Sequence, residues 1–196
     1  MPEHPPYRVV VVGAGFGGVG MASALGEAGI DDFLVLDRAG DLGGTWRDNT
    51  YPGLTCDIPS HLYSFSFRPG RWSRRFPPRQ EILAYLHEVS EERGLGPYLR
   101  FGSGVAAAEF DERRAVWNLT LDDGGTLQAT AVVSAVGQLN RPALPDIAGR
   151  DGFAGPWWHS ARWNHDVDLT GRRSWPPRAR TGWRSPPCRP RPPAGR

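Results

Sequence analysis

The sequence predicts an α/β domain with a doubly wound, mostly parallel sheet, and three consecutive stretches support this class. The stretch YRVVVVGAG, which begins at Tyr7, is a β-branched run ending in glycines, as expected of a strand buried on both faces. Small and apolar residues at helical spacing follow as far as Gly29, and DDFLVLDR then predicts a second short buried strand. Together these stretches form a βαβ unit of about 30 residues.

The next stretches predict the remaining elements of the same domain. Residues 40–78 are rich in Gly, Pro, aromatic residues and Arg without sustained periodicity, and so long an irregular segment in a compact domain is usually functional. RQEILAYLHEVSEERGLG has its apolar residues on one face, so we expect an amphipathic helix that ends at Gly94. Short alternating strands around DDGG predict a small β-meander near residues 105–130, and TAVVSAVG predicts a late buried strand.

The charge of the chain is distributed unevenly. All 23 basic residues are Arg, and the net charge is +2. Eight of these Arg lie in residues 172–196, which contain no acid, so the preceding residues carry 15 Arg against 21 Asp and Glu. The sequence pI of about 8.8 therefore reflects the C-terminal segment. We accordingly predict no nucleic-acid partner.

The C-terminal segment, residues 172–196, has the composition of a disordered tail. It contains eight Arg and seven Pro but no Val, Ile, Leu or Phe, so it buries too little apolar surface to offset its ordering entropy. Because Trp has a single codon, a shifted reading frame would turn the stretches around Trp175 and Trp183 into apolar residues. We interpret the tail as the product of a frameshift or a truncated gene, with an evolved disordered tail as the alternative.

The cysteines and the N-terminus bear on the compartment. Cys56 and Cys188 give neither a disulfide framework nor a metal-ligand spacing, so we expect no metal and a reducing compartment. The opening MPEHPPYR lacks the pattern of a signal peptide, which together with the cysteines predicts a cytoplasmic location. The apolar run before Ile30 approaches membrane length, but its clustered Gly and Glu27 favour a strand, turn and helix, so we expect no membrane partner.

The stretch GAGFGG carries the first chemical signal. It places Gly13, Gly15 and Gly18 in a G-x-G-x-x-G pattern, in which the glycines permit a tight turn, the approach of a pyrophosphate and close packing of helix on strand. Asp37 follows about 20 residues later at the end of the next strand, where a carboxylate can accept hydrogen bonds from ribose hydroxyls. This context predicts a Rossmann-like dinucleotide-binding domain, with a purely structural Gly-rich turn as the alternative.

The segment after Asp37 resembles a known family. GDLGGTWRDNTYPGLTCDIPSHLYSFSF is similar to the loop that wraps FAD in flavin-containing and Baeyer-Villiger monooxygenases, through its GGTW and YPGLTCD stretches. RRFPPRQEILAYL resembles a helix of that family, and SAVGQLNRPALPDIAG resembles its strand and turn beside the flavin. The resemblance covers residues 7 to about 172 and corresponds to the N-terminal, FAD-binding part only.

A fingerprint of the same family follows. FAGPWWHSARW fits the Baeyer-Villiger pattern F-x-G-x-x-x-H-x-x-x-W through Phe153, Gly155, His159 and Trp163. Asn164 stands where the fingerprint usually has Pro or Asp, and with HDVDLTG it points to relatives of 4-hydroxyacetophenone monooxygenase.

The resemblance implies which residues contact cofactors. Residues matched to FAD contacts are Gly13, Gly15, Gly17 and Gly18 at the pyrophosphate, Asp37 at the ribose, Thr45, Trp46, Arg47 and Asp48 along the flavin-side loop, Asp57 and Tyr63 near the isoalloxazine, Val105 at the adenine, and Gln138 near the end of the flavin-binding strand. Thr55 and Cys56, beside Asp57, match positions that touch NADPH. Asp57 is the catalytic candidate, through hydrogen bonding near the flavin.

Several of these residues also have structural interpretations. Asp37 replaces the commoner Glu, although a shorter carboxylate can still accept from a ribose. Trp46 fits simple core packing, and Asp57 fits a loop-capping residue. Cys56 is better interpreted as a small buried hydrophobe than as a redox thiol. His159 can orient the linker through backbone hydrogen bonds without transferring a proton.

The resemblance implies an FAD- and NADPH-dependent monooxygenase that converts a ketone to an ester or lactone with O2. The flavin supplies the oxygen chemistry, and the protein supplies positioning and electrostatics. In the family a second, NADPH-binding glycine motif follows DLTG, whereas RRSWPPRARTGW follows Gly171 here. We therefore expect an FAD-binding domain at residues 7–150, a linker with the fingerprint at residues 151–171 and the tail at residues 172–196 in place of the NADPH domain.

Two other functions compete with a ketone monooxygenase. A non-catalytic FAD-binding remnant of such an enzyme is the main alternative. A two-domain flavoprotein such as a disulfide reductase is disfavoured, because no C-x4-C redox pair follows the first helix.

Overall fold

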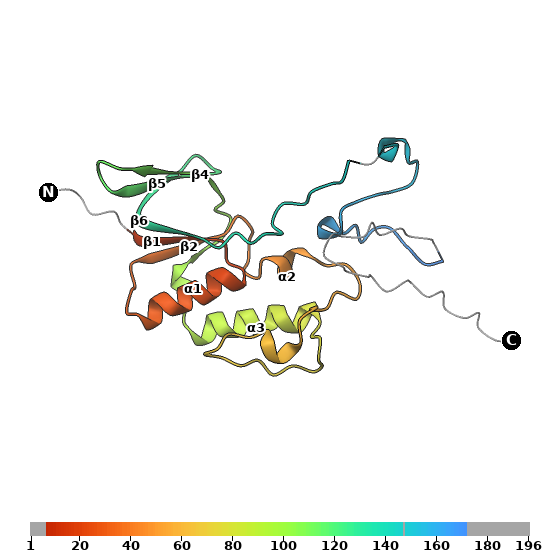
Figure 1. Ribbon diagram of the computed structural model, residues 1–196, viewed down its shortest axis with the longest axis horizontal. Helices are drawn as coiled ribbons and strands as arrows, with labels where there is room; N and C mark the ends of the chain where they lie inside the picture. Colours follow the sequence, from red (N-terminus) through yellow and green to blue (C-terminus); the bar gives the residue numbers. More distant parts are fainter. Residues whose placement is uncertain (1–6, 147, 172–196) are drawn as a thin grey trace.

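A six-stranded mixed sheet forms the centre of the computed structural model, which describes residues 7–146 and 148–171 (Figure 1). The strand order is β3-β2-β1-β6-β5-β4. The first four of these strands run parallel, and β5 and β4 continue the sheet antiparallel. Their bounds are β1 Tyr7–Val12, β2 Phe33–Leu36, β3 Leu99–Arg100, β4 Val105–Asp111, β5 Val116–Leu121 and β6 Thr126–Ser134.

The central strand β1 is buried on both faces because its side chains alternate between them. Val9 and Val11 belong to the core that contains the buried faces of α1 (Phe16–Glu27) and α3 (Arg79–Glu92). Val10 belongs to a second core with Leu119 and Ala129 of the meander. Both long helices thus cover one face of the sheet, and the meander curls over the other (Figure 1). The predicted Rossmann-like class with a small β-meander is confirmed.

Two predicted strands are one in the structure. The sequence separates the last strand of the meander from a late buried strand, whereas β6 runs without a break from Thr126 to Ser134. Its first half pairs antiparallel with β5, and its second half pairs parallel with β1. The meander is therefore an extension of a central strand, which fixes it to the sheet.

The amphipathic helix predicted before Gly94 is α3. Ile82, Leu86 and Val89 are fully buried on its inner face, and Gly94 follows the helix with a φ of 61°. The segment before it, residues 40–78, is largely irregular as predicted and contains α2 (Thr45–Asp48) and a short 3-10 turn, η1 (Ser60–Leu62). Within the described ranges, no helix has the length and apolar character needed to cross a membrane.

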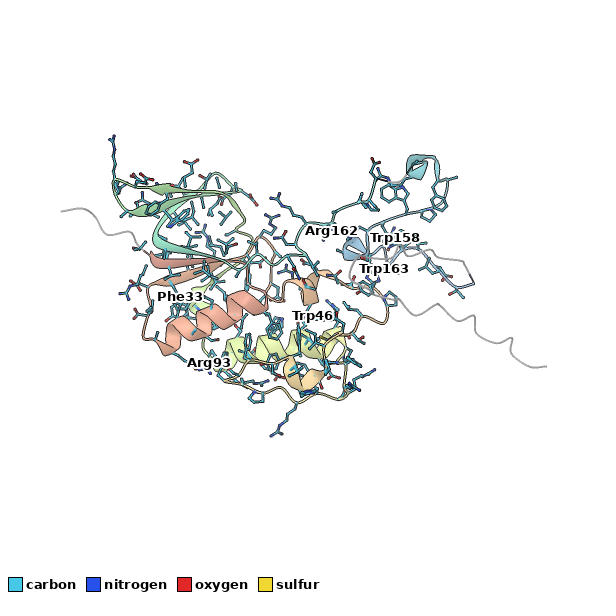
Figure 2. All side chains as sticks on the ribbon, viewed as in Figure 1. Phe33, Trp46, Arg93, Trp158, Arg162 and Trp163 are labelled. Carbon is cyan, nitrogen blue, oxygen red and sulfur yellow. The ribbon has the colours of Figure 1, made fainter. Side chains whose placement is uncertain are left out.

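Residues 135–171 leave the sheet and return to the loop after α2. His165 Nε2 lies 2.7 Å from Thr50 Oγ1, and the rings of Tyr51 and Trp163 are 6.2 Å apart. Trp163 also packs edge-on against Trp158, and the two lie next to each other in Figure 2. This segment includes three-residue 3-10 turns at Arg150–Gly152 (η3) and Ser160–Arg162 (η4), and Gly96–Tyr98 (η2) precedes β3. The tail predicted at residues 172–196 lies outside the described residues.

Candidate functional site

The glycine-rich loop joins β1 to α1. β1 ends at Val12 and α1 begins at Phe16, so the G-x-G-x-x-G pattern lies at the predicted strand-to-helix turn. Gly13 has a φ of 108°, and a side chain there would meet the carbonyl group of Ala135. A Cβ on Gly18 would overlap the carbonyl oxygen of Gly13. Contacts within the protein itself therefore require both of these glycines.

Gly15 and Gly17 are in a different situation. A Cβ on Gly15 would lie 3.5 Å from Cα of Gly44, and a Cβ on Gly17 would lie 3.6 Å from Cβ of Ala135, which are ordinary van der Waals distances. Gly15 has a φ of −81° and a ψ of −162°, an extended conformation open to any residue. The protein's own packing does not require glycine at these two positions, whereas a ligand that approaches the backbone would require it.

The first turn of α1 offers hydrogen-bond donors to an anion. Gly15 is the N-cap residue and supplies no side-chain hydrogen bond, and the first turn contains no acidic residue. The first N–H groups of a helix have no partner within the helix, and the helix dipole favours negative charge at this end. The loop and the helix together can therefore hold a phosphate group.

Asp37 is fixed beside this loop. It follows β2 and is 9% exposed. Its Oδ2 accepts a hydrogen bond of 2.8 Å from the N–H of Ala14, and its Oδ1 accepts one of 2.9 Å from Ala39. Arg47 Nη1 lies 3.4 Å from Oδ1. A carboxylate offers about four acceptor positions, so Asp37 can also accept a hydrogen bond from a ribose hydroxyl.

The residues that precede the helix α2 are hydrogen-bonded to the glycine loop. The N–H of Gly43 donates to the carbonyl of Ala14 at 2.9 Å, and α2 begins two residues later at Thr45. Arg47 bridges Asp37 and Asp48, with Nε 2.9 Å from Asp48 Oδ1. Burial lowers the pKa of Arg47, but the hydrogen bond to Asp48 and the charges of Asp48 and Asp37 outweigh burial and leave the pKa raised. The guanidinium is therefore a fixed positive charge beside the carboxylate of Asp37.

Trp46 and Tyr63 form a wall with Cys56 and Asp57. The indole N–H of Trp46 donates to the hydroxyl of Tyr63 at 2.9 Å, and Trp46 is 8% exposed. Burial raises the pKa of Tyr63, the hydrogen bond from Trp46 opposes this shift, and the negative charge of Asp57 adds to it. Cys56 is buried, and burial likewise raises the pKa of its thiol, whereas Asp57 is exposed. The structure thus brings these four predicted residues together at one place.

The three remaining predicted residues are Thr55, Val105 and Gln138. Thr55 forms an antiparallel bridge with Pro78, next to Cys56. Val105 is half-buried at the start of β4, two residues after Ser103, whose N–H donates to the backbone carbonyl of Asp37. Gln138 is exposed in the turn that follows β6.

The residues of the predicted fingerprint make local contacts within the linker. His159 is the N-cap of η4, where its Nδ1 accepts a hydrogen bond of 3.0 Å from the N–H of Ala161. Gly155 lies against the ring of Phe153, which is 62% exposed. Trp163 packs on Trp158. The hydrogen bond of His159 is local to the linker, and its proposed role in orienting the linker stays a prediction.

The chain is similar in sequence to a family of nucleotide-binding domains and to monooxygenases. A family model described as an NAD(P)-binding Rossmann-like domain matches residues 11–77, which span the glycine loop, Asp37 and α2. A Baeyer-Villiger monooxygenase from Streptomyces coelicolor is 53% identical over 171 residues, which are 87% of this chain and 33% of the relative. This chain is homologous to Baeyer-Villiger monooxygenases. Another, from Pseudomonas aeruginosa, is 42% identical over 167 residues, which are 85% of this chain and 32% of the relative.

Solved structures of the Baeyer-Villiger group have the same fold. A cyclohexanone monooxygenase from Rhodococcus sp. Phi1 bound to NADP+ superposes with a TM-score of 0.76 at 36% identity, over 86% of this chain and 33% of that chain. OTEMO in complex with FAD and NADP superposes with a TM-score of 0.75 at 33% identity, over 84% of this chain and 32% of that chain. The resemblance inferred from the sequence is confirmed. The chain spans about a third of the length of the relatives it matches.

Sequence reasoning missed two features of the site. Arg79, the first residue of α3, donates from Nη2 to the carbonyl of Arg47 at 3.1 Å and thereby contacts α2. Thr50 and His165 join the loop after α2 to the linker, although they are 115 residues apart in the chain. The amphipathic pattern predicted a helix from Arg79 onward but gave no signal of the partner of Arg79, and no local pattern links Thr50 to His165.

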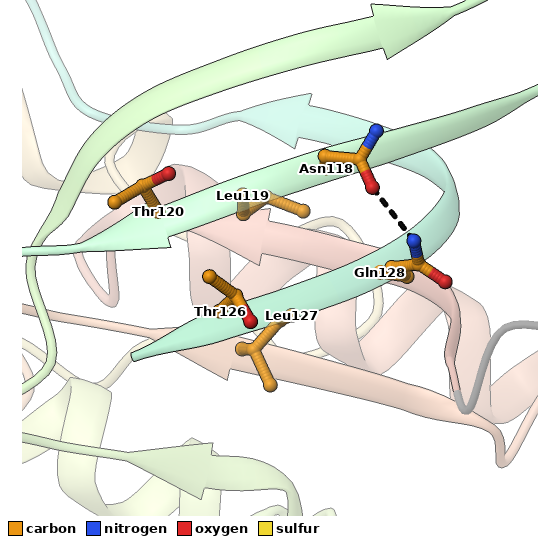
Figure 3. Close-up of a pocket in the computed structure, with 6 residues that line it drawn as sticks. All are labelled: Asn118, Leu119, Thr120, Thr126, Leu127 and Gln128. Atoms are coloured by element: carbon orange, nitrogen blue, oxygen red, sulfur yellow. Dashed lines mark hydrogen bonds between the residues drawn. The ribbon is translucent and has the colours of Figure 1, made fainter. Parts of the chain in front are cut away.

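A hollow of about 410 Å³ lies elsewhere, on the hairpin formed by β5 and β6 (Figure 3). Gln128 Nε2 donates to Asn118 Oδ1 at 2.7 Å across it. None of the predicted site residues lines this hollow. Its lining residues are Asn118, Leu119, Thr120, Thr126, Leu127 and Gln128.

Proposed function

We propose that this chain binds FAD at the carboxyl ends of β1 and β2, as the FAD-binding part of a Baeyer-Villiger-type monooxygenase. The observation that carries the proposal is the space beside Gly15, where a Cβ meets only an ordinary contact with Gly44. Glycine is unnecessary there for packing, but a pyrophosphate on the N-terminus of α1 needs a bare backbone. The buried Asp37, held beside the same loop, suits the adjoining ribose.

The flavin half of the cofactor is assigned to the segments after the glycine loop. α2 begins close to this loop and contains Trp46 and Arg47, and Trp46 contacts Tyr63. We assign Thr45, Trp46, Arg47, Asp48, Asp57, Tyr63 and Gln138 to the flavin side, Val105 to the adenine, and Gly13, Gly15, Gly17 and Gly18 to the pyrophosphate. Thr55 and Cys56, next to Asp57, are assigned to the edge of an NADPH site. OTEMO, a structural relative, was solved with FAD and NADP, which supports this choice of cofactors.

The chemistry proposed for the whole reaction is oxygen insertion beside the carbonyl of a ketone. When bound, FAD supplies the redox and oxygen chemistry, with NADPH as reductant and O2 as co-substrate. The residues of this chain bind and orient the cofactor. Asp37 accepts from the ribose, α1 holds the pyrophosphate, and the exposed Asp57 presents a carboxylate at the flavin edge of the site.

A pair of glycine substitutions tests the assignment. Gly15→Ala should lower FAD affinity about tenfold or more, because the new Cβ overlaps the pyrophosphate. The fold should persist, since Gly15 has an extended conformation and its Cβ position is uncrowded. Gly26→Ala in the same helix is the matched control, because no atom lies within 4 Å of the new Cβ. It should keep FAD binding and raise the free energy of unfolding by about 0.5–1 kcal/mol.

FAD affinity is measured by fluorescence titration of the purified variants, with circular dichroism to follow the fold. Equal FAD affinity for Gly15→Ala and the parent chain would refute the pyrophosphate assignment. Unfolding of Gly15→Ala would instead mean that packing requires this glycine.

A second candidate is an FAD-binding protein without turnover. It is considered because the chain spans about a third of the length of the relatives it matches, whereas hydride transfer from NADPH to FAD requires both nucleotides to be held. The two candidates differ in one measurement. NADPH consumption coupled to conversion of a ketone by the FAD-loaded chain identifies the monooxygenase, and FAD binding without either identifies the second candidate.

A further inference from the structure

We infer that Arg79 is a positioning residue that fixes the end of α2 against the loop leading to Asp57. In this way it would set the geometry of the flavin half of the proposed site. The consequence for FAD rests on the proposed function, whereas the effect of Arg79 on α2 does not. The inference depends on three contacts that meet at the start of α3.

The first two contacts tie the loop that carries Asp57 to the start of α3. The N–H of Cys56 donates to the carbonyl of Pro77 at 2.9 Å, and the N–H of Arg79 donates to the carbonyl of Leu54 at 3.1 Å. Thr55 and Pro78 lie between them as an antiparallel bridge. These hydrogen bonds therefore fix the backbone at Cys56 to the start of α3.

The third contact is made by the side chain of Arg79. Its Nη2 donates to the carbonyl of Arg47 in α2 at 3.1 Å. The other end of α2 is held at the glycine loop, where the N–H of Gly43 donates to the carbonyl of Ala14 at 2.9 Å. α2 is thus fixed at both ends, and Arg79 provides the anchor on the side of Asp57.

The Nε atom of Arg79 indicates that this side chain positions α2 and does not primarily stabilise the fold. It is buried and has no hydrogen-bond partner within the described part of the chain. An unpaired buried donor is costly, and such groups are rare in folded proteins. A shorter or apolar side chain would avoid that cost, but it would not reach the carbonyl of Arg47 with a charged donor.

The test compares three variants of the full chain by hydrogen exchange without FAD. Arg79→Met should speed exchange on the order of tenfold at the amides of Asp48 and Asn49, which close α2, and leave the amides of β1 unchanged. Arg79→Lys retains a donor and should restore most of the protection. Arg75→Met removes an exposed Arg from the same segment and should leave α2 as in the parent chain.

The same variants are titrated with FAD. Arg79→Met should bind FAD about tenfold more weakly, with an altered visible circular dichroism of the bound flavin, and Arg79→Lys should recover both. If Arg79→Met does not fold, Arg79→Lys and Arg79→Gln replace it, and the Gln variant should then show the faster exchange.

The outcomes separate the two proposals. Parent-like exchange of α2 in Arg79→Met, or an equal effect of Arg75→Met, overturns the role of Arg79. Failure of the parent chain to bind FAD overturns the proposed function, while exchange at α2 still decides the role of Arg79. Faster exchange at α2 with unchanged FAD affinity and spectrum overturns its influence on the flavin half of the site.

Discussion

The thiol of Cys56 lies in the wall formed with Trp46, Tyr63 and Asp57. It is 2% exposed, and its Sγ accepts a hydrogen bond of 3.4 Å from the N–H of Ile58. Burial raises the pKa of Cys56 above its ordinary value, so less of the reactive thiolate is present at any pH below that value. These features describe a packed side chain and not a redox thiol.

This environment predicts slow alkylation of Cys56. In a Cys188→Ala background, iodoacetamide at pH 8 should react with Cys56 at least about tenfold more slowly in the native protein than in urea, because the buried thiol is both protonated and covered. The rate should rise with pH as the thiolate forms. Mass spectrometry measures the labelled fraction over time, and equal native and denatured rates would contradict the packed environment.

The glycine motif illustrates what a residue pattern can predict. The spacing of Gly13, Gly15 and Gly18 located the strand-to-helix turn correctly, because a tight turn and close packing impose residue types locally. It could not separate the glycines required by packing from those left for a ligand. That distinction depends on Ala135 and Gly44, which are distant in sequence and meet the loop only in the fold.

At the level of elements, α3 holds the irregular segment that precedes it. The hydroxyl of Tyr85 accepts from the N–H of Phe65 at 2.8 Å and donates to the carbonyl of Arg68 at 2.6 Å. Arg68 in turn pairs with Glu88 and Glu92 on α3, each at 2.7 Å. One buried tyrosine therefore provides hydrogen-bond partners for two backbone groups of this irregular loop.

Removing this hydroxyl should destabilise the fold. Tyr85→Phe leaves the N–H of Phe65 without its partner, so the free energy of unfolding should fall by about 1–3 kcal/mol. Tyr98→Phe is the matched control, because the ring of Tyr98 stacks on Phe33 and is preserved, and its effect should stay within about 0.5 kcal/mol. Urea unfolding measures both. A loss no larger for Tyr85→Phe than for Tyr98→Phe would contradict the role of the hydroxyl.

The elements with strong periodicity were the ones that could be predicted. The βαβ unit and α3 are recognisable in the sequence because each must bury a continuous apolar face, which imposes a regular spacing of apolar residues. The continuity of β6 could not be predicted, because its alternating half and its buried half read as separate strands. The anchoring of α2 by Arg79 could not be predicted either, since hydrophobic periodicity indicates which residues are buried and does not identify hydrogen-bond partners.

On the scale of the whole molecule, the parallel part of the sheet gathers the candidate site from distant parts of the chain. The carboxyl ends of β1, β2 and β6 meet at one edge, where Gly13 contacts Ala135 and the N–H of Ala135 donates to the carbonyl of Val12 at 2.8 Å. In open parallel sheets, ligands bind outside this edge. The glycine loop and Asp37 are already in position there, joined by the hydrogen bond between Ala14 and Asp37.

This preformed half of the site predicts the order in which ligands stabilise the protein. FAD at about 100 times its dissociation constant should raise the free energy of unfolding by about 2.7 kcal/mol, since it binds the native state only. ADP should also stabilise the protein, because the glycine loop and Asp37 are positioned for its pyrophosphate and ribose. Its increase should be smaller than that of FAD, because ADP lacks the flavin half. FMN, which lacks the adenosine half, should give little at the same concentration. Urea unfolding with each ligand measures the order, and Gly15→Ala should weaken the effects of both FAD and ADP, to about 1.4 kcal/mol or less for FAD if its affinity falls tenfold or more. Stabilisation by FMN that equals or exceeds that by ADP would mean that the flavin half, and not the loop at Gly15, anchors the cofactor.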